Sequence, residues 1–304
     1  MPNLINNHTG ISFAQIQMQD ALNQIKVDIE NAIVTNGEKG KNALIRTQKP
    51  IKLIHDVVKT AFLNLGVHPS LINPELRRLQ RIANPPNRVN NRPIILKDKE
   101  LALAGYLKTK NQDVSIVPRN IVVHPETLTF PTYLNGFLDR FGTAFTESVL
   151  SVNVRSQLSS VAKNFDTLYE RTFAEALNFH LRSPRMVLGE VYMIILKEYN
   201  SDAAANHQVA FNNSEYIEKY ILAFQALNDR INIEDPLYKY ERIALLIVDF
   251  SQPIPKLYNT TQELIQDGLL NPNSVANIDR LSFPTFIQDL FNIYQTRFPE
   301  NSFS

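Results

Sequence analysis

The chain has 304 residues, of which 44% are hydrophobic and 20% are charged, and its formal net charge is +1. This ordinary composition excludes wholesale disorder, and the small net charge excludes a general affinity for polyanions, so any nucleic-acid surface must be local. The absence of cysteine excludes a disulfide framework, a thiolate zinc site and a cysteine nucleophile. With neither a long apolar stretch nor an export leader in the sequence, we expect a cytoplasmic protein without membrane attachment.

Helices are predicted over the first quarter of the chain. Apolar residues recur at helical spacing over residues 11–34, and Asn36-Gly37 is expected to end that helix with a turn. Pro50 suits the first turn of a second helix, which Gly66 closes. A further helix is expected after Pro74.

Residues 75–99 are the most basic part of the chain, with seven lysines and arginines against two acidic residues. Arg88 and Arg92 lie in a segment rich in proline and asparagine, residues 85–93. This segment is either a solvated surface loop or an arm that follows phosphates, to which arginine offers bidentate hydrogen bonds. Composition leaves both interpretations open. The candidate DNA-binding residues of this basic arm are Arg77, Arg78, Arg81, Arg88 and Arg92.

The middle of the chain alternates strands with helices. Two segments alternate apolar and polar residues and two are continuously apolar, which is typical of strands. The predicted strands are 113–118, 148–155, 186–196 and 243–250. Helices are predicted from Asn164 or Asp166 to before Pro184, over residues 215–227, and again after Thr261.

These elements predict an α/β fold, with a mixed central β-sheet flanked by helices and helical additions at both ends. We expect a helical N-terminal region with the basic arm over residues 1–94, a core over 95–260 and a helical C-terminal extension over 261–304. All three are expected to form one compact domain.

A carboxylate stands at the head of the first predicted strand. Asp113 follows Lys108, Lys110, Asn111 and Gln112. A Mg²⁺ site needs oxygen ligands fixed in place, and neighbouring lysines would offset the charge of a bound phosphate. Aspartates also cap strands without any chemistry, so this feature alone is weak.

Two polar residues share one face of the second predicted strand. Asn153 and Arg155 are two positions apart, so their side chains point to the same side. This face lines a site, or it faces solvent at the edge of the sheet. Both interpretations are open.

The helix that follows carries three carboxylates whose directions can be predicted. With about 100° per residue measured from Phe173, Asp166 and Glu170 lie on the apolar face and Glu175 points to water. A carboxylate turned toward the sheet needs a partner. For Glu170 this is a metal ion or a structural ion pair with Arg155.

The run from Gly105 to Val114 resembles the G-F-x-K-x-K-x-Q-D-V stretch of type II restriction endonucleases. The run from Val152 to Phe165 resembles their second motif, in which a strand ending in (D/E)-x-K-S leads into K-N-F and a long helix. Both motifs belong to the PD-(D/E)XK nuclease superfamily, and the resemblance spans about residues 95–200. It implies a restriction-endonuclease-like core that cleaves double-stranded DNA with Mg²⁺. It also implies a homodimer and a companion DNA methyltransferase.

Three positions carry the resemblance into the candidate site. Asp113 matches the first metal-binding aspartate, Asn153 stands at the second carboxylate, and Arg155 stands at the lysine. Asparagine can coordinate Mg²⁺ but brings no charge, and arginine cannot act as a general base. Some members of the superfamily take the glutamate from the next helix, about fourteen residues after the lysine. Glu170 lies 15 residues after Arg155.

The resemblance therefore implies metal ligands at Asp113, Glu170 and Asn153. It places Arg155 and Lys110 at the phosphate, Gln157 beside water or phosphate, and Lys108 against DNA. Two alternatives remain. One is a sequence-specific DNA-binding protein on the same fold with impaired catalysis, and the other is an interaction protein that binds no nucleic acid.

Overall fold

The computed structural model describes residues 17–75, 99–161, 163–213, 216–301 and 303, and the backbone of two short strands, β1 (Leu4–Asn6) and β2 (Ser12–Ala14). The helix expected after Pro74 lies outside the described residues. So do the arginines of the basic arm, Arg77, Arg78, Arg81, Arg88 and Arg92.

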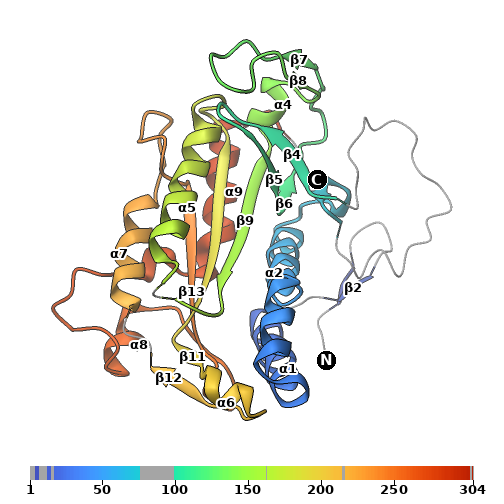
Figure 1. Cartoon of the computed structure of the whole chain (residues 1–304). Helices are drawn as coiled ribbons and strands as arrows, with labels where there is room; N and C mark the ends of the chain where they lie inside the picture. Colours follow the sequence, from blue (N-terminus) through green and yellow to red (C-terminus); the bar gives the residue numbers. More distant parts are fainter. Residues whose placement is uncertain are drawn as a thin grey trace.

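A mixed six-stranded sheet forms the centre of the molecule, as predicted (Figure 1). Its strands lie side by side in chain order: β3 (Ile72–Asn73), β6 (Val114–Ile116), β9 (Leu150–Gln157), β10 (Val187–Ile195), β13 (Arg242–Asp249) and β14 (Lys256–Tyr258). The strands β9, β10 and β13 are parallel, and the others pair antiparallel. Every residue of β10 and β13 is buried, which explains their continuous apolar sequences.

Helices cover both faces of this sheet, so the predicted α/β class is confirmed (Figure 1). On one face lie α5 (Phe165–His180) and α7 (Ile217–Leu227). On the other lie α2 (Ile51–Asn64) and α9 (Phe283–Arg297). Gly189 of β10 allows α9 to approach, because a Cβ at this position would lie 2.6 Å from Leu290 Cδ1.

The predicted break at Asn36-Gly37 is confirmed, and a second helical segment follows it. Helix α1 (Met18–Arg46) has non-helical backbone at Gly37, and it begins later than the predicted residue 11, because Ser12–Ala14 form β2. Gly37 adopts a φ of 63°, and a Cβ on it would lie 3.1 Å from the Ala204 carbonyl oxygen of α6 (Ser201–Ala205). The glycine therefore forms a kink against a neighbouring helix, and α1 continues beyond it.

Shorter elements complete the described fold. Three hairpins lie beside the central sheet: β4 (Leu101–Ala104) with β5 (Thr109–Gln112), β7 (Glu126–Thr127) with β8 (Leu138–Asp139), and β11 (Lys197–Tyr199) with β12 (Phe211–Asn213). The remaining helices are α4 (Thr143–Ser148), α8 (Thr261–Gln266) and the 3-10 turns η1 (Pro69–Leu71) and η2 (Asp279–Leu281). None of the described helices has the length and apolar character that crossing a membrane requires.

A buried ion cluster fixes α9 to the sheet. Glu241 is fully buried and accepts hydrogen bonds from Arg230 at 2.8 Å, Arg297 of α9 at 2.7 Å and the Leu188 amide at 2.7 Å. His180 Nε2 lies 3.4 Å from the same carboxylate. Burial alone would raise the pKa of Glu241, but His180 and the two arginines lower it to about 2. The carboxylate is therefore ionised and stabilises this part of the core.

Candidate functional site

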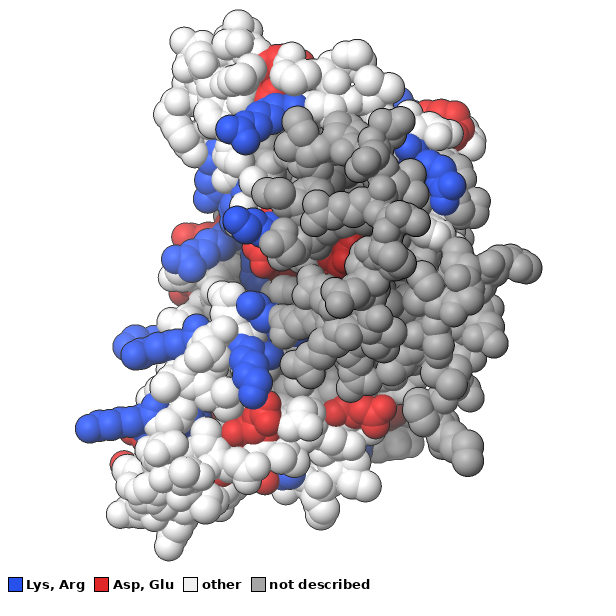
Figure 2. Space-filling view, turned by 90° about the vertical axis from the view of Figure 1, so that its right-hand side faces the viewer, with Lys and Arg blue, Asp and Glu red and all other residues white. Residues whose placement is uncertain are grey.

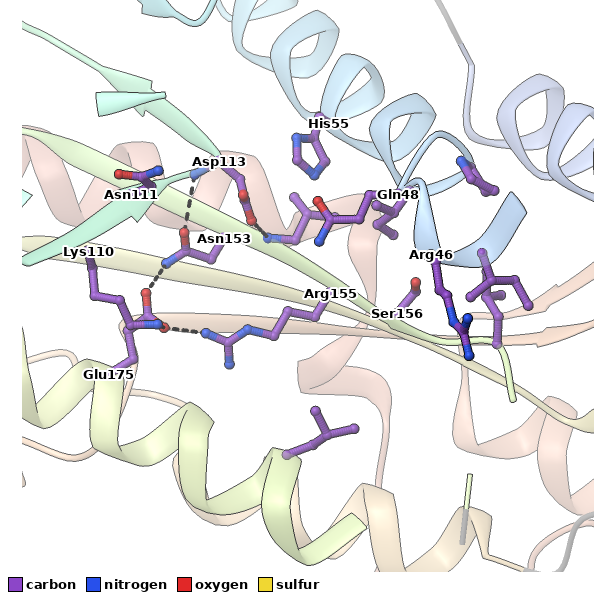
Figure 3. Close-up of a pocket in the computed structure, with 16 residues that line it drawn as sticks. Arg46, Gln48, His55, Lys110, Asn111, Asp113, Asn153, Arg155, Ser156 and Glu175 are labelled. Carbon is purple, nitrogen blue, oxygen red and sulfur yellow. Dashed lines mark hydrogen bonds and ion pairs between the residues drawn. The ribbon is translucent and has the colours of Figure 1, made fainter. Parts of the chain in front are cut away.

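The candidate site lies where β6 stops pairing with β9. The two strands pair only as far as Val114 and Val152, so Asn153 and the residues after it occupy an edge of β9 without a partner strand among the described residues. A cavity of about 440 Å³ opens there. Its walls come from the α1–α2 junction, β5, β9 and α5 (Figure 3).

Asp113 lies at the end of β6 that faces this cavity. Its carboxylate accepts a hydrogen bond of 2.8 Å from the Val154 amide, and its own amide donates to Asn153 Oδ1 at 3.3 Å. The side chain thus replaces the missing strand at the edge of β9. Burial raises the pKa of Asp113 to about 6, although the Val154 hydrogen bond opposes this shift.

Asn153 connects two carboxylate residues. While its Oδ1 accepts from the Asp113 amide, its Nδ2 donates to Glu175 Oε1 at 3.0 Å and to Gln112 Oε1 at 3.2 Å. Gln112 is completely buried. One amide group therefore spans the gap between β6 and α5, which brings Asp113 and Glu175 to the same cavity.

Glu175 is the buried carboxylate of α5 in this cavity. It is 2% exposed and forms ion pairs with Lys110 Nζ at 2.8 Å and with Arg155 Nη2 (Figure 3). Arg155 also donates to Thr172 Oγ1 at 2.9 Å. Burial opposes the charge of Arg155, but Glu190 and Glu175 outweigh it and raise its pKa above the usual value. Lys110 and Arg155 are thus both paired with carboxylates.

Glu190 is a third carboxylate, placed behind Arg155. It lies beside Asn153 in the register of β10 and β9, is fully buried, and its Oε1 is 3.4 Å from Arg155 Nε. Neither of its oxygens has a hydrogen-bond partner among the described residues. Burial raises the pKa of Glu190 to about 8, with Arg155 acting against it. The protein therefore keeps an incompletely satisfied carboxyl group next to the site.

The predicted direction of the α5 carboxylates is wrong. Glu170 and Asp166 are exposed, and Glu175 is the buried one. The buried face of α5 includes Phe179, from which Glu170 lies nine residues away, or about half a turn around the helix. The aromatic residues that suggested the other face, among them Phe173, stack along its half-exposed side. Glu170 therefore cannot supply a ligand to this cavity.

The other predicted residues divide between the cavity and its surroundings. Asp113, Asn153, Arg155 and Lys110 all line the cavity. Gln157 does not, because its amide donates to the carbonyl oxygens of Ser159 and Ser160 in the turn after β9. The role predicted for Gln157 beside water or phosphate therefore lacks support, and its contacts are those of a turn-stabilising residue.

Lys108 lies in the turn between β4 and β5 and is exposed, outside the cavity lining. Asn178 of α5 holds this turn: its Oδ1 accepts from the Leu107 and Lys108 amides at 2.7 and 2.9 Å, and its Nδ2 donates to the Lys108 carbonyl. A Cβ on Gly105 would lie only 2.2 Å from Asn178 Nδ2. The glycine of the sequence motif thus lets the hairpin that carries Lys110 dock on α5.

Several cavity residues were not predicted from the sequence. Among them are Glu175, Arg46, Gln48 and His55, and Glu190 lies behind Arg155. Only Glu190 left a recognisable signal, since it is a single carboxylate within a continuously apolar strand. Glu175 was assigned to water, and the other three come from the distant α1–α2 junction.

The cavity combines carboxylates with amide oxygens. Asp113 and Glu175 face Lys110 and Arg155, so the formal charges of these four groups cancel, and burial raises the pKa of Glu190 behind them to about 8. Among the described residues, no group of three or more histidine, cysteine, aspartate and glutamate side chains is arranged to hold a metal ion. The available donors are carboxylate and amide oxygens, which are the ligands preferred by Mg²⁺.

Charge on the outer surface is mixed. On the face shown in Figure 2, lysine and arginine side chains project along one margin, with aspartate and glutamate side chains among them. This agrees with the small net charge of the whole chain.

Comparison of the chain with protein-family models, with curated proteins and with solved structures finds no match.

Proposed function

We propose that this protein is a type II restriction endonuclease, which hydrolyses phosphodiester bonds of double-stranded DNA at specific sequences with Mg²⁺. One observation carries the proposal. Asp113, Asn153 and Arg155, the positions matched to the nuclease motifs, lie around one cavity and share it with the buried carboxylate of Glu175. Antiparallel pairing of β6 with β9 brings Asp113 and Asn153 together across 40 residues of chain, and Glu175 of α5 joins them at the cavity.

The donor set fits a hard divalent cation. Asp113 and Glu175 supply carboxylate oxygens, and Asn153 supplies an amide oxygen. These three residues would hold the ion, with water completing its coordination. A bound Mg²⁺ polarises a phosphate and lowers the pKa of bound water.

The basic side chains of the cavity have a separate role. Arg155 and Lys110 approach Glu175 from two strands and place positive charge where a phosphate would lie. The guanidinium of Arg155 has N–H groups beyond those bonded to Glu175 and Thr172, and these could donate to phosphate oxygens and stabilise the charge that develops on them. Because arginine stays protonated, we assign no proton transfer to it.

Incubation of the wild-type protein with supercoiled plasmid DNA tests this function. We expect discrete fragments in Mg²⁺ or Mn²⁺ and intact plasmid in EDTA. The fragments should be the same at every enzyme concentration, because a site-specific nuclease stops when its sites are consumed. Plasmid that stays intact in both metals, or a continuous smear, would contradict the proposal.

A second candidate is a DNA-binding protein of the same fold that has lost catalysis. The observation in its favour is that Glu175 is already paired with Lys110 and Arg155, while an asparagine stands at the second carboxylate position. In that case DNA should shift in a gel without being cut. The double variant Asn153→Asp with Arg155→Lys should then cleave DNA that the wild-type protein only binds. If the protein is an active nuclease, the wild type should cleave DNA without these substitutions.

Cutting both strands of a palindromic site asks for two active sites related by a dyad, so we propose a homodimer on DNA. Sedimentation with and without a cleavable duplex tests this. A single protomer per duplex at all concentrations would exclude it.

A further inference from the structure

The turn between α1 and α2 forms the wall of the cavity opposite Lys110 and Glu175 (Figure 3). Helix α1 ends at Arg46 and α2 begins at Ile51. The turn and its flanking residues contribute six residues to the lining: Ile45, Arg46, Gln48, Pro50, Ile51 and His55. This part of the chain belongs to neither nuclease motif.

Hydrogen bonds of the backbone and of the Thr47 side chain stabilise the turn. Thr47 Oγ1 donates to the Leu44 carbonyl at 2.6 Å and accepts from the Lys49 amide at 3.2 Å. The Gln48 amide donates to Ile45 at 3.1 Å, and the Gln48 carbonyl accepts from Lys52 at 3.2 Å. The side chains of the turn are therefore presented from a fixed support.

Gln48 occupies an unfavourable backbone conformation at this point. Its φ is 57°, in the left-handed region where a side chain other than that of glycine, asparagine or aspartate is uncommon. Glycine would adopt the same conformation without strain. Residues held in such conformations cluster at ligand-binding sites, where the strain is offset by function. Here the strained residue directs its amide side chain over the cavity (Figure 3).

Charge balance makes Arg46 the remaining cation for an anionic ligand. Of the lysines and arginines that line the cavity, Lys110 and Arg155 are paired with carboxylates. Within the described part of the chain, Arg46 forms no ion pair, and neither Arg46 nor Gln48 makes a hydrogen bond through its side chain. A phosphodiester placed against Asp113 would have these two groups on its open side.

We propose that the α1–α2 turn is a DNA-contacting element, in which Arg46 pairs with a backbone phosphate and Gln48 donates to the same strand. This inference rests on the proposed nuclease function and adds a substrate-binding wall to it. It assigns DNA contact to the N-terminal helices independently of the basic arm. The α1–α2 turn and β9 then contact the nucleic acid from two sides.

Fluorescence anisotropy with a labelled mixed-sequence duplex of about 30 base pairs in EDTA tests the inference under conditions that prevent cleavage. Arg46→Ala should weaken binding about tenfold at low salt and reduce the slope of log K against log salt by about 1. Lys39→Ala is the matched control, since Lys39 is an exposed cation of the same helix that does not line the cavity. Its affinity should stay within about twofold of wild type, the range expected of a neutral surface change.

Gln48→Gly separates function from stability. The variant should have a higher Tm because it relieves the strained backbone, and yet bind DNA about threefold or more weakly because an amide contact is lost. Ser160→Gly is the control, because Ser160 has a φ of 53° outside the cavity lining. It should raise the Tm without changing the affinity.

The outcomes distinguish the two proposals. If wild-type protein cuts plasmid but Arg46→Ala and Gln48→Gly bind DNA as wild type does, the turn is not a DNA contact and the nuclease function stands. If wild-type protein neither binds nor cuts DNA at low salt, the nuclease proposal fails and the inference fails with it.

Discussion

Replacing Glu190 with glutamine should make the protein more stable at neutral pH. Glu190 is fully buried behind Arg155, and burial raises its pKa to about 8, against 4.5 for an exposed glutamate. The folded state therefore binds a proton that the unfolded state has released at pH 7. This proton uptake on folding lowers the free energy of unfolding, and a glutamine variant does not have this loss of stability.

The magnitude follows from the two pKa values. Between pH 4.5 and the pKa of Glu190 in the folded state, near 8, each pH unit lowers the free energy of unfolding by about a further 1.4 kcal/mol. At pH 7 this amounts to about 3 kcal/mol, which corresponds to a rise in Tm of about 5 °C for a chain of 304 residues. At pH 5 the difference should fall below about 1 kcal/mol.

Glu241 provides a control of opposite sign. It is also fully buried, and its cationic partners lower its pKa to about 2, so its ionised form stabilises the fold above pH 4.5 and this contribution is lost as the pH falls toward 2. Glu241→Gln should therefore cost about 3 kcal/mol at pH 7. Replacement by glutamine at pH 7 should thus raise the free energy of unfolding at one of these two buried glutamates and lower it at the other.

Urea unfolding at pH 5 and pH 7 measures both effects. We expect the stability of Glu190→Gln relative to wild type to increase from pH 5 to pH 7, and Glu241→Gln to be less stable than wild type at pH 7. A Glu190→Gln variant that is destabilised at pH 7, or whose difference from wild type is the same at both pH values, would refute the reasoning. Glu190 would then be an ordinary ion-pair partner of Arg155.

Two further predictions concern the site and its support. Burial raises the pKa of Asp113 to about 6, and only its ionised form can hold a cation. Cleavage at subsaturating Mg²⁺ should therefore fall about tenfold per pH unit below pH 6 and level off above pH 7. A cleavage rate that rises as the pH falls through 6 would contradict this. Gly105→Ala should lower the free energy of unfolding by about 1–3 kcal/mol, because the new Cβ would meet Asn178 Nδ2 at 2.2 Å, and unchanged stability in urea would show that the hairpin does not need this close contact.

The sheet could be predicted because the burial of its central strands makes their sequences apolar. The apolar runs 186–196 and 243–250 correspond to β10 and β13, which are buried at every position and therefore need apolar residues on both faces. The strand predicted over 148–155 is displaced by two residues, because Ser148 ends α4. Local sequence was enough where burial was complete.

The site could be predicted only in part, because its helix buries polar residues. The face of α5 turned inward includes Thr172, Glu175 and Asn178, which bond to Arg155, Lys110 and the β4–β5 turn. Apolar periodicity does not indicate such a face. It indicates the half-exposed side of α5 instead, because the aromatic residues lie there. The α1–α2 wall could not be predicted for another reason, since only the folded chain brings residues 46 and 155 to the same cavity.

Plasmid cleavage by a matched pair of α5 variants tests the central claim most directly. Glu175 and Glu170 lie on the same helix, the first inside the cavity and the second exposed. In Mg²⁺ we expect Glu175→Gln to lower the cleavage rate by at least about 100-fold while Glu170→Gln cuts at the wild-type rate. Equal activity in the two variants, with both folded, would show that the carboxylate in the cavity has no part in catalysis.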